Sequence, residues 1–205
     1  MQIAVFGATG GTGREVVRQA LEQGYTVRAL VRDPAKLPIQ HPHLTILQGN
    51  VLTPADVVAT LTSCDAVVVS LGNTPNNPTT VVSDGTANIL RAMQEQGIRR
   101  VIVVTSLGVG DSKRQVPFFF SLLAATALRG VMADKEAQEQ LVRASGLDWT
   151  IVRPGGLVDG PPTGKVTTGL DKRIKAGQVT RGDVAAFVLA QLTDTTYLHA
   201  APAIT

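Results

Sequence analysis

Short apolar runs rich in β-branched residues recur along the chain, separated by longer segments in which apolar positions follow a helical period. Such runs are typical of parallel strands that are buried on both faces of a sheet. They occupy residues 1–6, 26–31, 44–47, 66–69, 101–104 and 149–152. The segments that predict helices occupy residues 12–23, 54–61, 80–96 and 119–145. Three of these segments are followed by a glycine, Gly24, Gly97 or Gly146, as is common where a helix ends.

This alternation predicts an α/β fold, a single-domain Rossmann-type doubly wound parallel sheet with right-handed crossovers. The chain has 205 residues, 44% of them hydrophobic, and no low-complexity stretch divides it, so we expect one domain over residues 1–205. Ligands of such folds bind outside the carboxyl ends of the strands. We expect the substrate side of the site at about residues 106–135 and 153–175.

Charge and composition narrow the range of partners. The formal net charge of +3 is modest, aromatic residues make up 4% of the chain and no basic stripe is interleaved with aromatic residues, so we expect no nucleic-acid partner. The single cysteine, Cys64, excludes an intramolecular disulfide and is expected to be a buried apolar residue at the start of a strand. Because the first strand leaves no room for a signal peptide, we expect a cytoplasmic protein, acting as a monomer on a small molecule.

The most apolar stretch, residues 116–129, leaves several interpretations open. It is too short and too close to Lys113 and Arg129 to predict a membrane span, so we expect no membrane partner. Core packing of a helix, an apolar wall or lid over a flat acceptor, and a partner surface remain alternatives.

A glycine-rich turn joins the first strand to the first helix and has the composition of a dinucleotide phosphate site. Glycines are needed there because the turn is tight, because the backbone approaches the diphosphate and because the helix packs closely on its strand. The anion is then held by free N–H groups at the positive end of the helix dipole. The residues expected to bind the cofactor here are Gly7, Thr9, Gly10, Gly11, Thr12 and Gly13.

The carboxyl end of the second strand indicates which cofactor is preferred. An NAD site places an acidic residue there for the ribose hydroxyl, whereas a 2′-phosphate requires cations, and this chain has Arg32 and, one turn later, Lys36. Asp33 is the competing acidic candidate, but Pro34 follows it and favours a turn or cap role for its carboxylate. The sequence therefore predicts NADPH as the cofactor.

The remaining strand ends supply polar and small residues to the same edge of the sheet. We expect an amide and a small apolar side chain against the adenine, close backbone approach to the ribose and diphosphate, and a hydroxyl beside the nicotinamide. The cofactor-binding residues in these places are Asn50, Val51, Leu71, Gly72, Thr105, Pro154 and Gly155. Ser106, at the end of the fifth strand, is the candidate catalytic residue, expected to orient the nicotinamide and the acceptor.

A set of short motifs spread over nearly the whole chain carries a family resemblance. The motifs are Gly7-Ala8-Thr9-Gly10-x-Thr12-Gly13, Leu30-Val31-Arg32-Asp33, Gly49-Asn50-Val51-Leu52, Leu71-Gly72, Pro78-Thr79-Thr80-Val81, Thr105-Ser106 and Pro161-Pro162-Thr163-Gly164. Together they resemble the branch of atypical short-chain dehydrogenases/reductases that contains biliverdin-IXβ reductase, also called flavin reductase. The resemblance implies NADPH-dependent hydride transfer to a flavin (FMN, FAD or riboflavin) as substrate rather than prosthetic group, and to some open-chain tetrapyrroles.

The chain departs from that family at several positions. Gly11 stands where the family's turn carries glutamine, and Asn50 replaces an aspartate. The loop over residues 73–77 is shorter and lacks an arginine. Gly156 and Lys135 fall where the animal enzyme has histidines on the substrate side. Residues 149–155 also resemble NmrA-like proteins, which keeps open a second hypothesis, a non-catalytic NADP-binding redox sensor or assembly factor.

The tyrosine of the Tyr-x-x-x-Lys motif, which protonates the substrate in ordinary short-chain dehydrogenases, has no counterpart. Tyr25 and Tyr197 are each followed four residues later by alanine, and Val131 occupies the tyrosine position in front of Lys135. Alcohol dehydrogenation and sugar epimerisation are therefore disfavoured. A conjugated acceptor can take its proton from water, which leaves the protein to hold two planar rings in contact.

Two further features receive structural interpretations. The pair His41 and His43 has no third ligand nearby, so we expect no metal. Residues 181–185 open the last helix, and Asp183 is expected to cap it rather than to act as an acid.

Overall fold

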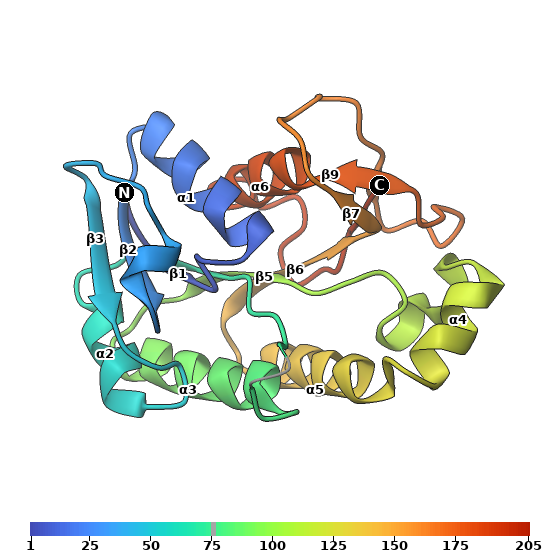
Figure 1. Ribbon diagram of the computed structural model, residues 1–205, viewed down its shortest axis with the longest axis horizontal. Coiled ribbons are helices and arrows are strands. Elements are labelled where there is room, and N and C mark those ends of the chain that lie inside the picture. The colour runs from blue at the N-terminus through green and yellow to red at the C-terminus, as the bar shows by residue number, and fades with distance from the viewer. Residues whose placement is uncertain (75–76) are drawn as a thin grey trace.

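A computed structural model of the protein describes residues 1–74 and 77–205, and at residues 119–121 and 125 the backbone alone. Its central sheet has eight strands in the order β3-β2-β1-β4-β5-β6-β10-β8 (Figure 1). The first six pair in parallel and coincide with the predicted runs. They are β1 Gln2–Phe6, β2 Thr26–Val31, β3 Leu44–Gln48, β4 Ala66–Val69, β5 Arg100–Val104 and β6 Asp148–Pro154. The predicted Rossmann-type α/β fold is confirmed.

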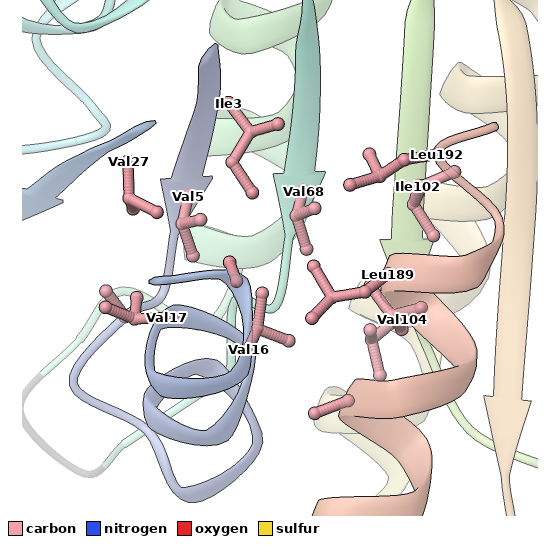
Figure 2. Packing of buried hydrophobic residues seen from close by; sticks show 14 of the residues in the cluster. Ile3, Val5, Val16, Val17, Val27, Val68, Ile102, Val104, Leu189 and Leu192 are labelled. Carbon is pink, nitrogen blue, oxygen red and sulfur yellow. The ribbon is translucent and has the colours of Figure 1, made fainter. Parts of the chain in front are cut away.

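Helices cover both faces of this sheet (Figure 1). One face carries α1 Gly11–Glu22 and α6 Arg181–Ala190, and the other carries α2 Pro54–Leu61, α3 Val81–Glu95 and α5 Arg129–Ala144. Successive residues of a strand point to opposite faces, so Ile3 and Val5 of β1 pack beneath α1 whereas Ala4 and Phe6 pack against the other layer. Figure 2 shows the first layer, in which Val16 of α1 lies near the side chains of the sheet.

The predicted helix over residues 119–145 is wrong as a single element. It consists of α4 Phe118–Ala125 and α5, separated at Thr126, whose φ of −114° and ψ of −94° are not helical. The Thr126 hydroxyl donates a hydrogen bond to the carbonyl oxygen of Leu122 (2.9 Å), and Leu128 N donates to the carbonyl oxygen of Leu123 (3.0 Å), which closes the turn locally. Such side-chain bonding competes with the continuation of a helix.

Helix α4 projects from the end of the α5 layer (Figure 1). Phe118, Leu122 and Leu123 are exposed, so core packing is wrong for these three residues of the apolar stretch. In the same stretch, the side chains of residues 119–121 and 125 lie outside what the structure describes. Within the described residues, no helix combines the length and the apolar character that crossing a membrane requires.

Four short strands were not predicted. A separate parallel pair consists of β7 Gly156–Val158 and β9 Gln178–Thr180, and the main sheet is extended by β10 Ala203–Ile204 and by β8 Thr168–Gly169 at its edge. Strand β8 runs antiparallel to β10, so the outermost strand departs from the all-parallel prediction. Elements of two or three residues are too short to show a hydrophobic period.

The last helix begins at Arg181 as predicted, but its cap is Thr180 and not Asp183. The Thr180 hydroxyl oxygen accepts a hydrogen bond from Asp183 N at 3.0 Å. The Asp183 carboxylate instead accepts hydrogen bonds from Thr163 N (2.7 Å) and Gly164 N (2.9 Å) and so fixes a distant loop to α6. Burial raises the pKa of this carboxyl, but the hydrogen bonds from Thr180, Gly164 and Thr163 outweigh it and leave the pKa of Asp183 below its ordinary value.

Candidate cofactor and substrate cleft

A cleft of about 1070 Å³ lies at the carboxyl ends of the parallel strands. Every predicted site residue except Gly13 lines it, from Gly7 after β1 to Gly155 after β6. The fold therefore gathers into one cleft residues that are scattered through most of the chain, at the edge of the sheet where doubly wound folds bind ligands.

The glycine turn has the geometry that a phosphate site requires. Gly7 adopts a φ of +86°, and a Cβ there would lie 2.2 Å from the carbonyl oxygen of Ser70. A Cβ on Gly13 would lie 2.1 Å from the carbonyl oxygen of Gly7, so Gly13 serves the close packing of α1 on the turn instead of the cleft wall. Helix α1 starts after Gly10 without a side-chain cap from any described residue, which leaves its first N–H groups free to bind an anion.

Two cations line the cleft beyond β2. Arg32 donates a hydrogen bond from Nη1 to Oδ1 of Asn77, and the Lys36 ammonium lies 3.9 Å from the Asp33 carboxylate. Asp33 is the N-cap of the 3-10 helix η1 Pro34–Lys36 and accepts a hydrogen bond from Ala35 N at 3.1 Å. The cap interpretation of Asp33 is therefore confirmed, and the two cations fit a 2′-phosphate better than a free ribose hydroxyl.

The loop after β3 is held rigid by local hydrogen bonds. Oδ1 of Asn50 accepts from Leu52 N at 3.0 Å, and the carboxylate of Asp56 accepts from Asn50 N at 2.8 Å. Asn50 and Val51 both line the cleft, where an adenine ring is expected. Asn73, Thr74 and Asn77 of the loop over residues 73–77 also line the cleft, whereas residues 75–76 are outside the described part of the chain.

The opposite end of the cleft is built by Thr105, Ser106 and Lys135. The Lys135 ammonium donates a hydrogen bond to the Thr105 carbonyl oxygen at 3.4 Å, and the Ser106 hydroxyl donates to the Leu107 carbonyl oxygen at 2.9 Å. Burial lowers the pKa of Lys135 to about 8, although the carboxylates of Asp134 and Glu139 oppose this shift. The Ser106 oxygen keeps its lone pairs available as acceptors.

Behind this end lies an ion network that was not predicted, with Arg153 and Glu139 buried and Asp111 exposed. Arg153, only 2% exposed, contacts Glu139 (Nε to Oε1, 2.9 Å) and Asp111 (Nη1 to Oδ1, 2.7 Å). The Thr105 hydroxyl donates to Glu139 at 2.8 Å, so the network fixes the end of β5. Burial raises the pKa of Asp111, but hydrogen bonds from Lys172 and Arg153 bring it down to about 2. The sequence held one indication of this network, the arginine within the apolar run of β6, because a buried cation requires an anion as its partner.

Several residues considered from the sequence lie outside the cleft wall. Tyr25 packs against the core, and the ring of Tyr197 lies tilted by 56° against that of Phe187, with centroids 5.8 Å apart. Val131 lines the cleft beside Lys135, in agreement with the missing tyrosine. Cys64 is buried as predicted, and its burial raises the pKa of the thiol to about 11. None of the described residues from 116 to 130 lines the cleft, and none of the described His, Cys, Asp and Glu side chains form a group of three or more that could hold a metal ion.

Residues 7–195 match the model of a family described as NAD(P)H-binding. The chain belongs to this NAD(P)H-binding family, and its domain is of the Rossmann-like type found in short-chain dehydrogenases and epimerases.

Proteins similar to this chain in sequence carry names of different functional classes. An uncharacterized chloroplastic protein of Arabidopsis thaliana is 31% identical, covering 93% of this chain and 71% of its own. An uncharacterized sugar epimerase of Bacillus subtilis is 29% identical, covering 95% and 89%. The photosystem II assembly factor Ycf39 of Synechocystis is 31% identical over 78% of this chain and 46% of its own length, so this chain spans about half of that relative.

Solved structures share the fold along the whole chain. ChuY, an anaerobilin reductase from Escherichia coli O157:H7, superposes with a TM-score of 0.83 at 26% identity, covering 100% of this chain and 96% of its own. A short-chain dehydrogenase/reductase from Veillonella parvula, solved with NADP, gives a TM-score of 0.82 at 20% identity, covering 99% and 93%. The second likeness concerns the fold alone. The protein thus has an NAD(P)H-binding fold of the oxidoreductase type.

Proposed function

We propose that the protein is an NADPH-dependent reductase that transfers a hydride to a flavin taken as substrate, FMN, FAD or riboflavin, and to linear tetrapyrroles of the biliverdin-IXβ type. The observation that carries this proposal is the asymmetry of the cleft. Arg32 and Lys36 offer cations for a 2′-phosphate, whereas the other end presents Ser106 and the Lys135 ammonium, and neither tyrosine lines its wall.

The residues of the far end would hold and orient two planar rings. When bound, the dihydronicotinamide supplies a hydride, which carries both electrons to the acceptor. With its hydroxyl proton donated to the Leu107 carbonyl oxygen, Ser106 would accept hydrogen bonds at the contact through its lone pairs, and Thr105, fixed by Glu139, would keep the strand end in place. The conjugated system of the acceptor delocalises the incoming electron pair. The acceptor can therefore take its proton from water, and no acidic group of the protein is required. The likeness to ChuY at 26% identity supports a reductase of this kind.

The second candidate is a non-catalytic NADP-binding assembly factor or redox sensor. The 31% identity to the photosystem II assembly factor Ycf39 favours it, although this chain spans only 46% of that protein. The absence of a tyrosine acid from the cleft wall fits both candidates, so turnover must separate them.

The decisive experiment measures NADPH oxidation by the purified protein against FMN, FAD, riboflavin, biliverdin isomers and quinones, with NADPH binding measured by calorimetry in parallel. We expect saturable turnover with flavins and no step in its pH dependence from a tyrosine or histidine. Tight NADPH binding without turnover on any acceptor would favour the sensor or assembly role. Failure to bind NADPH would contradict both candidates.

A further inference from the structure

The first residue of α6 lies across the first residue of α1. A Cβ on Gly11 would be 2.5 Å from Nε and 2.6 Å from Cδ of Arg181, closer than Cβ atoms approach non-bonded neighbours. Glycine at position 11 therefore leaves the space through which the Arg181 side chain crosses the glycine turn. Arg181 also lines the cleft, although no sequence motif indicated it.

The electrostatics of this contact favour an anion between the two helices. The N-terminus of α1 carries the positive end of the helix dipole, and the Arg181 guanidinium adds a full positive charge beside it. In the described part of the chain, the guanidinium's ion pair is with Asp159, through Nη1 at 2.7 Å, and the Asp159 side chain is 92% exposed. An exposed carboxylate of this kind holds an arginine only weakly. Nε and Nη2 make no hydrogen bond to any described residue.

We propose that Arg181 is a cofactor-binding residue that pairs with the diphosphate of NADPH above the glycine turn. This inference rests on the proposed use of NADPH. A guanidinium presents parallel N–H groups that match two phosphate oxygens, and such charge-assisted pairs are among the strongest hydrogen bonds in proteins. Phosphate oxygens at the α1 N-terminus would then be bound from two sides, by backbone N–H groups and by Arg181.

The proposal accounts for two positions at which this chain departs from the family pattern described above. Gly11 lacks the side chain that would occupy the space above the turn, and residues 73–77 include no arginine. Arg181 supplies a cation to the cleft from α6. The alternative is that Arg181 only ties α6 to Asp159 through a surface ion pair.

Ligand fragments separate these roles. We would titrate NADPH, 2′-phospho-ADP-ribose, which contains the diphosphate, and 2′-AMP, which lacks it, into Arg181→Gln and into the matched control Arg173→Gln. Arg173 is an exposed arginine outside the cleft wall, paired with Asp171. Arg181→Gln should weaken the two diphosphate ligands roughly 10- to 100-fold and leave 2′-AMP within about twofold. Arg173→Gln should change none of the three.

The outcomes are distinct. Unchanged affinity for 2′-phospho-ADP-ribose in Arg181→Gln, or equal losses for that ligand and for 2′-AMP, would overturn the role of Arg181. If the unmodified protein bound none of the ligands, the NADPH proposal itself would fail. Thermal unfolding of each variant identifies misfolding, and Arg181→Lys, which keeps the charge without the paired N–H groups, should give an intermediate loss.

A double-mutant cycle tests the link to Gly11. Gly11→Ala places a methyl group where the Arg181 side chain crosses, so it should weaken NADPH binding in the unmodified background. In the Arg181→Ala background, which removes the atoms that cross the turn, the same change should have a much smaller effect, because no side chain is left to be displaced. Purely additive losses would show that Gly11 acts independently of Arg181 and would contradict the proposed geometry.

Discussion

The two ends of the cleft use charge in opposite ways. At the end beyond β2, the cations are exposed, and the Lys36 side chain is 69% exposed with its nearest carboxylate 3.9 Å away. At the end beyond β5, Arg153 and Glu139 are almost fully buried and bonded to one another. Exposed cations remain available to a ligand, whereas buried ones are already satisfied by the protein. The first arrangement suits recognition, and the second suits positioning of Thr105 and its neighbour Ser106.

The largest expected effect tests the buried end. Glu139→Gln removes the carboxylate that faces Arg153 and leaves a buried guanidinium without full compensation, which should lower the free energy of unfolding by about 3–5 kcal/mol. Urea unfolding monitored by circular dichroism measures it. The matched control is Glu136→Gln on the same helix, which breaks a solvent-exposed pair with Lys113 and should cost about 1 kcal/mol or less. Equal losses would remove the contrast between buried and exposed charge.

The next prediction concerns the exposed end. Arg32→Ala should weaken NADPH binding roughly 10- to 150-fold, corresponding to about 1.5–3 kcal/mol for a charge-assisted contact, and should hardly change NADH binding. Calorimetric titration with both cofactors provides the measurement, and Arg173→Ala serves as the control for lost charge. Equal affinity of the unmodified protein for NADPH and NADH would contradict the assignment of this end to the 2′-phosphate.

A third prediction uses Lys135, which lies between the two arrangements because it is half-buried and also lines the cleft. Burial lowers its pKa from 10.5 to about 8, so between these values the unfolded chain binds the extra proton. The contribution of Lys135 to stability therefore rises with pH across this window. Relative to Lys135→Met, the unmodified protein should gain about 2 kcal/mol between pH 7 and 9.5. Parallel pH dependences of unfolding in the two proteins would show that the amine is solvated.

The smallest expected effect concerns Ser106. If its hydroxyl orients the rings, Ser106→Ala should lower turnover with a flavin roughly 2- to 12-fold, the size of one hydrogen bond, and leave NADPH affinity nearly unchanged. Steady-state kinetics together with calorimetry separates the two quantities. The control variant is Ser145→Ala, because Ser145 lies at the far end of α5, away from the cleft. Ser112→Ala is unsuitable as a control because the Ser112 hydroxyl is buried in a turn. A collapse of cofactor affinity with unchanged turnover at saturation would make Ser106 a binding residue.

The elements around the glycine turn could be predicted because their determinants are local. Gly7 must adopt a positive φ within a few residues of its strand, and the six parallel strands are recognisable in the sequence as apolar runs. The cations of the exposed end follow the same logic, since Arg32 and Lys36 come directly after β2. Local patterns of this kind survive folding because they depend on neighbouring residues alone.

The remainder depends on residues that meet only in the folded chain. Arg153 forms an ion pair with Asp111, which lies far from it in the sequence. Arg181 lies over Gly11, although nearly the whole chain separates Arg181 from Gly11. The interruption of the helix at Thr126 depends on the carbonyl group to which its hydroxyl donates a hydrogen bond. The two-residue strand β10 forms by pairing with β6. No period or motif encodes such pairings, so the contacts of Arg153 and Arg181 could not be predicted from the sequence.

The walls of the cleft come from the beginning, the middle and the last helix of the chain, from Phe6 to Arg181. A ligand that fills such a cleft acts as a reversible crosslink, because unfolding must release it. Binding to the native state alone adds about 2.7 kcal/mol of stability when free ligand stands at 100 times its dissociation constant. The lifetime of the protein against proteases would then depend on how much free cofactor surrounds it, so that cofactor scarcity shortens the survival of the protein itself.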